Sequence, residues 1–211
     1  MVQTDCFVPN RLAYFLGVGK YTPNDGKAGE TGWKLPLVRQ WKCIALYWSK
    51  LACMEGSRLN KCIALWSDNK SSRACKTWAY NVKTYFSTND LDAYCSLENP
   101  IARIFAQLVE NKTFEVFTRK WLTRISREVG PSGRGQNKLR LYKVLKTDFT
   151  TEQYCKIILP VKHRSAFSKL RLGVAPIRIE TGRYEGLKLE NRICPFCADS
   201  TVESELHVLL N

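Results

Sequence analysis

The chain has 211 residues, a hydrophobic fraction of 45%, six Trp and a formal net charge of +14 at pH 7. This composition is typical of a globular protein of one or two domains, and it excludes a disordered or low-complexity chain. Because no apolar run approaches the roughly 18 uncharged residues of a membrane-spanning helix, the sequence also excludes a membrane protein.

The chain contains nine cysteines, and its opening MVQTDCFVPN lacks the charged and apolar regions of a signal peptide. We therefore expect an intracellular protein of the cytoplasm or nucleus, whose cysteines stay reduced. Seven cysteines lack metal-ligand spacing, and we interpret them as small buried hydrophobic residues. They are Cys6, Cys43, Cys53, Cys62, Cys75, Cys95 and Cys155.

Residues 15–33 are rich in glycine and contain the turn signal PNDG at 23–26, so they are predicted to form a loop. The GVGK at 17–20 is not a phosphate-binding loop. That motif needs glycine and Ser or Thr where Tyr14 and Tyr21 stand.

Three helices are predicted next. The first begins near Pro36, which suits a first helical turn, and the others cover about residues 57–66 and 72–86. The apolar face predicted for the first helix comprises Leu37, Trp41, Ile44, Trp48 and Leu51.

Apolar residues from 101 to 125 fall on two different helical stripes, which predicts two helices separated by a break near residues 111–113. Lys120, Arg124 and Arg127 lie opposite the second stripe. They form a first predicted basic face.

The segment GPSGRG at 130–135 holds three glycines and a proline, so we interpret it as a flexible hinge and a domain boundary. Residues 1–130 would form a helical linker region. Residues 131–211 would form a basic helical region that ends in a zinc knuckle. The predicted fold class is mainly α, a helical array with a Gly-rich hinge and a small C-terminal zinc knuckle that lacks one ligand.

Beyond the hinge, a short helix near residues 140–146 carries a second basic face formed by Arg140, Lys143 and Lys146. Thr150 and Gln153 fit a capping box for another short helix that ends before Pro160.

The next predicted helix has the apolar stripe Ala166, Phe167, Leu170 and Val174. Four cations flank this stripe on both sides and form a weaker basic patch. These cations are Lys162, Arg164, Lys169 and Arg171.

The positive charge is concentrated between residues 119 and 183, where 16 Lys and Arg face only four acids. Each basic face alone is compatible with an ordinary solvated helix surface. Two such faces on either side of a hinge favour binding of a polyanion, with RNA or DNA as the commonest partner and an acidic protein or a membrane surface as alternatives.

The strongest chemical signal is the pair Cys194 and Cys197, because a CxxC turn lets two thiolates bind one metal ion. His207 follows ten residues after Cys197 on a predicted helix, for which Ser200 and Glu203 would form a capping box. A redox CxxC is the alternative, but no thioredoxin-like βαβ pattern surrounds it. We therefore predict a zinc site with these three ligands, and we expect the fourth just beyond Asn211.

The runs RICPFC at 192–197 and ESELHVLLN at 203–211 resemble the zinc-binding segment downstream of the reverse transcriptase in non-LTR (jockey-like, LINE-type) retrotransposon proteins. In that family a cysteine follows about where residue 212 would be. RSAFSKLRLG at 164–173 and residues 176–183 resemble the helix and turn that lead into this segment, and FLGVGKYTPN at 15–24 and RLNK at 58–61 are similar to the preceding linker. The resemblance covers nearly the whole chain and is most specific at 164–211.

The resemblance implies a C-terminal, nucleic-acid-binding part of an RNA-directed DNA polymerase. The expected partners are RNA or DNA and the polymerase portion of the parent protein, with no small-molecule substrate. The family's polymerase Asp-Asp pair does not occur in the sequence, and the two histidines are His163 and His207, so we expect no catalysis. The alternatives are a basic protein-interaction adaptor with a structural zinc site, and a decayed element fragment without a selected role.

Overall fold

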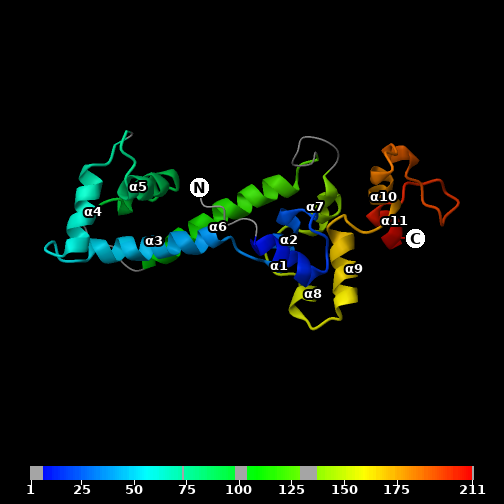
Figure 1. Ribbon diagram of the computed structural model, residues 1–211, viewed down its shortest axis with the longest axis horizontal. Helices are drawn as coiled ribbons and strands as arrows, with labels where there is room; N and C mark the ends of the chain where they lie inside the picture. The colour runs from blue at the N-terminus through cyan, green and yellow to red at the C-terminus, as the bar shows by residue number, and fades with distance from the viewer. Residues whose placement is uncertain (1–6, 73, 98–103, 129–136, 211) are drawn as a thin grey trace. The chain divides into compact units, whose positions relative to one another are not determined.

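The computed structural model describes residues 7–72, 74–97, 104–128 and 137–210, and its regular elements are helical, which confirms the predicted mainly α class (Figure 1). The α-helices are α1 (Phe7–Leu16), α2 (Asn24–Thr31), α3 (Pro36–Ala52), α4 (Leu59–Asn69), α5 (Trp78–Thr88), α6 (Ile104–Ile125), α7 (Tyr142–Leu145), α8 (Gln153–Lys156), α9 (Val161–Arg171), α10 (Arg178–Tyr184) and α11 (Glu205–Leu210). Three short 3₁₀ turns are η1 (Asp92–Tyr94), η2 (Lys138–Arg140) and η3 (Leu189–Asn191).

The chain forms two compact units. The central unit comprises residues 34–117, and the terminal unit comprises residues 1–33 and 118–211. The predicted hinge at 130–135 lies outside the described residues, so the division into 1–130 and 131–211 stays a prediction. The two units divide the chain at other points, because the N-terminal helices α1 and α2 pack with elements from the second half of the sequence.

The core of the central unit is built by α3, α4, α5 and the beginning of α6. Trp48 and Leu51 of α3 are buried as predicted, and the Trp48 ring meets the edge of Phe86 from α5 at a centroid distance of 5.8 Å. Leu37, predicted on the same face, is 49% exposed. α4 begins at Leu59, and α5 begins at Trp78. The start of α5 is several residues later than expected, because the Thr77 side chain caps this helix by accepting a hydrogen bond from the Tyr80 amide.

The predicted break in α6 is wrong, because one helix continues from Ile104 to Ile125. Its two apolar stripes serve two different cores. Phe105 and Val109 are buried in the central unit, whereas Trp121 and Ile125 are buried in the terminal unit. A change of face therefore marks a change of packing partner and not an interruption of the helix.

The loop predicted for residues 15–33 is also wrong in part, because residues 24–31 form α2. Its glycines allow close packing. A Cβ atom on Gly29 would lie 2.3 Å from the Tyr142 hydroxyl and 2.6 Å from the Trp121 ring. α2 ends at Gly32, which has φ +61° and donates to helix carbonyls as a left-handed cap.

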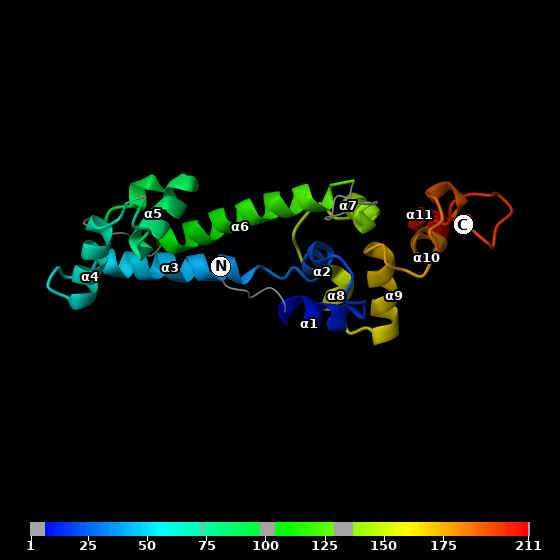
Figure 2. The ribbon, with the colours of Figure 1, turned by 45° about the horizontal axis from the view of Figure 1, so that its top comes forward.

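The terminal unit packs α1 against α2 and α9, and these three helices lie close together in both views (Figures 1 and 2). The end of α6 contacts α2 through Trp121 and Arg124. Trp121 lies in the centre of the core of this unit. Its ring meets the Phe149 ring edge-on, with the ring centroids 5.0 Å apart. Trp121 Nε1 donates a hydrogen bond to the Asp25 carbonyl at 2.9 Å. The packing face of α9 is small and polar, since Ser165 and Ser168 are buried. Phe167, predicted in a buried stripe, is 56% exposed.

The interpretation of isolated cysteines as buried residues is wrong for four of them. Cys43, Cys53, Cys62 and Cys75 are exposed. Cys95 and Cys155 are half-buried, and Cys6 lies outside the described residues. Cys43 and Cys62 lie on helices, whereas Cys53 and Cys75 lie outside them. The sequence pattern did not distinguish exposed cysteines from buried ones.

Candidate metal centre and basic surfaces

Residues 192–204 fold back on α10 and hold two of the predicted ligands, Cys194 and Cys197. Ile193 and Val202 form an isolated antiparallel bridge, and the Cys194 amide donates to the Thr201 carbonyl at 2.9 Å. The Glu203 amide in turn donates to the Arg192 carbonyl at 3.0 Å. Main-chain bonds therefore place the CxxC turn beside the start of α11.

α11 is capped by Ser204 and not by the predicted box of Ser200 and Glu203. The Ser204 hydroxyl accepts a bond from the His207 amide at 3.2 Å, three residues further on. Ser200 has a positive φ of 50°, and the buried Glu203 carboxylate accepts from the Arg178 amide at 2.6 Å. The cap sets the first turn of α11 and with it the position of His207.

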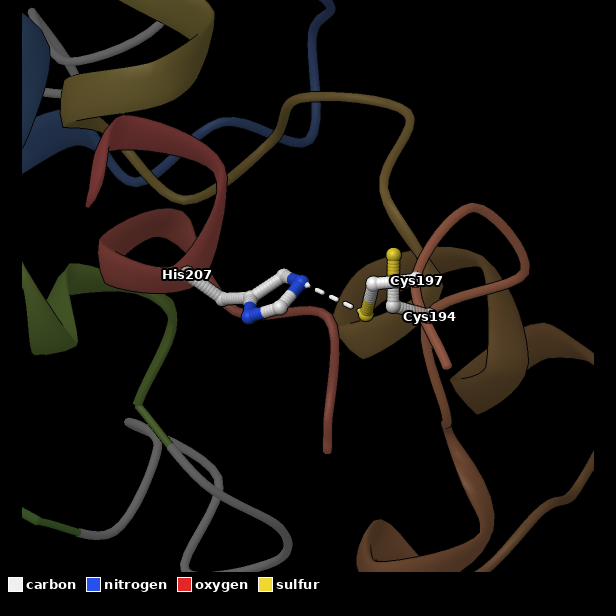
Figure 3. Close-up of side chains that lie close together, drawn as sticks. All are labelled: Cys194, Cys197 and His207. Atoms are coloured by element: carbon white, nitrogen blue, oxygen red, sulfur yellow. Dashed lines mark hydrogen bonds between the residues drawn. The ribbon is translucent and has the colours of Figure 1, made fainter. Parts of the chain in front are cut away.

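The structure brings the three predicted ligands together (Figure 3). The thiol sulfurs of Cys194 and Cys197 and a ring nitrogen of His207 lie within 4.8 Å of one another. His207 Nε2 is 3.3 Å from Cys197 Sγ. Cys194 is buried, while the other two are half-buried. These three residues form a cluster that could hold a metal ion.

The spacing of the donor atoms fits a tetrahedral ion. Zinc with sulfur at about 2.3 Å and nitrogen at about 2.0 Å would separate sulfur from nitrogen by about 3.5 Å and the two sulfurs by about 3.8 Å. The observed limit of 4.8 Å thus requires only small side-chain rotations. Two thiolates and one imidazole form a soft donor set, which suits zinc better than calcium or magnesium.

Thr201 is a residue of this site that sequence reasoning missed. Its hydroxyl lies 3.3 Å from His207 Nδ1, the ring nitrogen that does not face Cys197. A partner on one ring nitrogen orients the other nitrogen toward a metal. The contact depends on the turn after Cys197, and no spacing rule in the sequence marks it.

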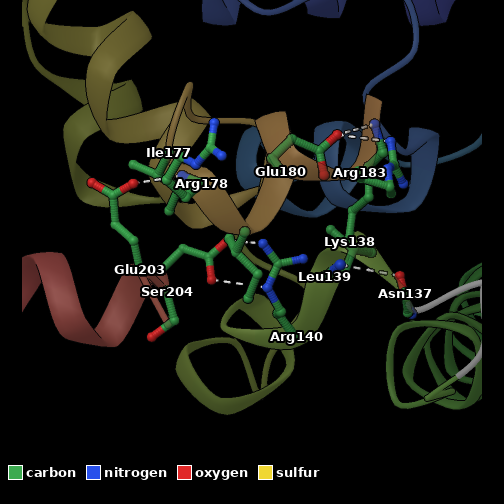
Figure 4. Close-up of polar contacts among 12 residues, drawn as sticks. Asn137, Lys138, Leu139, Arg140, Ile177, Arg178, Glu180, Arg183, Glu203 and Ser204 are labelled. Atoms are coloured by element: carbon green, nitrogen blue, oxygen red, sulfur yellow. Dashed lines mark hydrogen bonds and ion pairs between the residues drawn. The ribbon is translucent and has the colours of Figure 1, made fainter. Parts of the chain in front are cut away.

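One predicted nucleic-acid-binding cation, Arg140, instead anchors the C-terminal segment together with Lys138, which was not among the predicted cations (Figure 4). Arg140 donates through Nε and Nη2 to the buried Glu205 carboxylate at 2.9 and 2.5 Å. Beside it, Lys138 lies 2.8 Å from the buried Glu180 carboxylate. The acid partners come from α11 and α10, so these pairs hold the two helices beside the Cys/His cluster against η2.

Lys146 and Arg171 also point inward. Lys146 is 3% exposed, and its ammonium group binds the Glu152 carboxylate and the Thr150 carbonyl. Arg171 donates to the Glu30 carboxylate at 3.1 Å and lies 3.2 Å from Glu152. Glu30 is fully buried, and burial raises the pKa of its carboxyl although the bonds from Arg171 oppose this shift.

Arg124 and Arg164 contact neighbouring elements as well. Arg124 of α6 forms a bidentate ion pair with Asp25 of α2, in which Nε and Nη2 donate three hydrogen bonds of 2.8 to 3.0 Å to the carboxylate oxygens. Arg164 of α9 donates to the Phe15 carbonyl at 2.7 Å. The prediction of ten outward-facing cations therefore needs correction, because five of them also stabilise the terminal unit.

The other five predicted cations face solvent wholly or in part. Lys120, Arg127 and Lys162 are exposed, and Lys143 and Lys169 are half-exposed. Among the described residues no ion pair involves their side chains. They remain the best candidates for contacts to phosphate.

No family model matches the chain, and no curated protein or solved structure matches it. In the described part of the chain, no helix is long and apolar enough to cross a membrane.

Proposed function

We propose that the chain is a zinc-stabilised nucleic-acid-binding segment of the kind found downstream of the reverse transcriptase in non-LTR retrotransposon proteins. The observation that carries the proposal is the convergence of Cys194, Cys197 and His207 within 4.8 Å, in a chain of net charge +14. The resemblance of residues 164–211 to that family supports it. The proposal is one of binding and includes no catalytic step.

Zinc would act here as a structural cross-link. Cys194 and Cys197 supply thiolates from one turn, and His207 supplies an imidazole from α11. Closing this cross-link fixes α11, and with it Glu205, whose carboxylate holds Arg140. The metal cluster and the η2 turn therefore support each other.

Zinc binding is tested by competition with a colorimetric metal indicator. Cys197→Ser removes one thiolate, and we expect it to weaken zinc binding more than the roughly 10- to 100-fold typical of losing a hydrogen-bond partner of a ligand. Thr201→Val removes such a partner, and we expect a loss within that range. Cys75→Ser is the matched control, since Cys75 is exposed and lies outside the cluster. Equal zinc affinity of Cys197→Ser and Cys75→Ser would contradict the site.

Nucleic-acid binding is tested by titrating the full chain with zinc into labelled RNA and DNA at several salt concentrations. Each phosphate contact to duplex DNA contributes about −0.9 to the slope of log affinity against log salt concentration. We expect binding at low salt and a slope of several units. Absence of binding to RNA and DNA at low salt would overturn the proposal.

The competing function is a protein-interaction adaptor, favoured by an exposed apolar stripe on α4. Leu59, Ile63 and Trp66 are 71%, 54% and 62% exposed at helical spacing. A pull-down before and after nuclease treatment separates the two functions, because partners bridged by nucleic acid are lost after treatment.

A further inference from the structure

Planar side chains form a row where the end of α1 meets α9. The Arg164 guanidinium lies 4.4 Å from the centre of the Phe15 ring. One turn along α9, the Phe167 ring stacks on the Tyr154 ring, with centroids 5.9 Å apart and planes inclined by 26°. Arg164 and Phe167 are three positions apart, so they are neighbours on the helix surface. We name Phe15, Arg164, Phe167 and Tyr154 the planar row.

The planar row is accessible and held in place. Phe15 is 37% exposed and Phe167 is 56% exposed. The backbone beneath is tied down, since Ser165 Oγ donates to the Gly17 carbonyl at 2.6 Å. Gly17 has φ +65°, and a Cβ atom there would lie 2.6 Å from Ser165 Cβ. Rings fixed in this way lose little conformational entropy when another planar group stacks on them.

The surroundings of the planar row are positive. Residues 10–23 and 157–177 contain no acidic residue, whereas they supply Lys20 in addition to Arg164. Among the acids of the packed elements, Glu30 and Glu152 are paired with Arg171, and Asp25 is paired with Arg124. Lys20 is exposed. A negatively charged chain could therefore lie along this surface without meeting a free carboxylate in these segments.

Exposed rings between cations match one chemistry best, that of unpaired nucleic-acid bases. Successive bases of a single strand can stack on aromatic and guanidinium planes while cations contact the phosphates. A duplex hides the faces of its bases, so it could use the cations but not the rings. An acidic protein would likewise depend on charge alone.

We propose that the planar row binds unpaired bases of single-stranded RNA or DNA. The inference rests on the proposed nucleic-acid-binding function and names the form of nucleic acid and the surface that takes it. Phe15 and Phe167 provide stacking planes, Arg164 continues the row between them, and Lys20 contacts a phosphate.

The test measures fluorescence anisotropy of the full chain with zinc, titrated into a labelled 20-nucleotide oligo(dT), an oligo(U) of the same length and a 20-base-pair duplex. Phe167→Leu should weaken single-strand binding by about 5- to 150-fold, the equivalent of roughly 1–3 kcal/mol for one stacked base. Its affinity for the duplex should not change. Phe167→Tyr keeps a ring and should retain single-strand affinity. The RNA and DNA arms show which strand is preferred.

Trp66→Leu is the control, because Trp66 is equally exposed but lies in the central unit. It should leave single-strand affinity unchanged. The thermal midpoint of each variant verifies folding. If Phe167→Leu weakens duplex and single-strand binding equally, or if it weakens neither of them, the stacking proposal is overturned while the proposed nucleic-acid binding stands. If no form of nucleic acid binds to the wild type, both proposals are overturned.

Discussion

Arg140 and Lys143 lie three positions apart and were predicted on one basic face, yet they take different roles. Arg140 is paired with the buried Glu205, whereas no ion pair of the described residues involves Lys143. Whether a cation serves stability or binding thus depends on a carboxylate 65 residues away in the sequence. Individual substitutions can separate the two roles.

Arg140→Gln should destabilise the protein, because it leaves the Glu205 carboxylate buried without its partner. Breaking a buried pair costs about 3–5 kcal/mol, and partial exposure of Arg140 reduces this to about 2–4 kcal/mol. Lys143→Gln should change stability by less than about 0.5 kcal/mol. Urea denaturation measures both. Equal effects of the two substitutions would contradict a special role for Arg140.

Lys27 of α2 is a second residue whose environment gives a prediction. It is 1% exposed, and burial lowers the pKa of its ammonium group. Lys27→Met should therefore stabilise the fold at pH 7 by about 1–2 kcal/mol. The folded wild type releases this proton at a lower pH than the unfolded chain, so its stability relative to the variant rises as the pH increases toward 10.5.

Thermal denaturation of both proteins between pH 7 and 10.5 measures this difference. The difference in stability between Lys27→Met and the wild type should be largest at pH 7 and should decrease as the pH rises toward the alkaline range. A constant advantage over the whole range would indicate a packing effect unrelated to the charge of Lys27.

At the scale of elements, α6 shows how one helix serves two cores. Its first turns pack Phe105 and Val109, and its last turns pack Trp121 and Ile125 on another face. Midway, the buried Thr113 hydroxyl donates to the Val109 carbonyl at 2.6 Å and contacts Tyr85, whose hydroxyl pKa is raised by burial. The middle of α6 is therefore packed, although the periodicity of the sequence changes there.

Lys112→Gly tests the continuity of α6. Glycine costs about 1 kcal/mol relative to alanine inside a helix, and it costs little in a break between helices. We expect Lys112→Gly to be about 1 kcal/mol less stable than Lys112→Ala in urea denaturation. Both variants remove the 3.9 Å contact of Lys112 with Glu115, so they form a matched pair. Equal stability would support the break at 111–113.

At the scale of the whole molecule, the C-terminal cluster combines three ligands with buried ion pairs from η2. Structural zinc sites use four ligands, and the family that residues 192–211 resemble has a cysteine about where residue 212 would be. The cluster supplies three donor side chains, and a tetrahedral zinc ion would take a fourth donor.

Extension of the chain by one cysteine after Asn211 should strengthen zinc binding, because a fourth thiolate can complete the tetrahedron. Competition with a metal indicator should give at least about a tenfold higher affinity for the extended chain than for one extended by serine. Equal affinities would argue against a fourth ligand at this position.

Several features of this protein could be predicted from local sequence alone. Helical periodicity and the proline at 36 indicated a mainly α fold, and the spacing of Cys194, Cys197 and His207 indicated a cluster that the structure brings together. These predictions succeed because a helix and a CxxC turn depend on neighbours a few residues apart.

Only the tertiary structure decided which cations are internal, why the glycines of α2 belong to a helix, and where α1 meets α9. Arg124 finds Asp25 across 99 residues, and Gly29 packs beneath Trp121 and Tyr142. Local patterns do not contain such pairs, because burial and charge compensation arise where distant segments meet. The sequence thus determined the helical class and the cluster of Cys194, Cys197 and His207, and packing between distant helices decided which charges and rings face solvent.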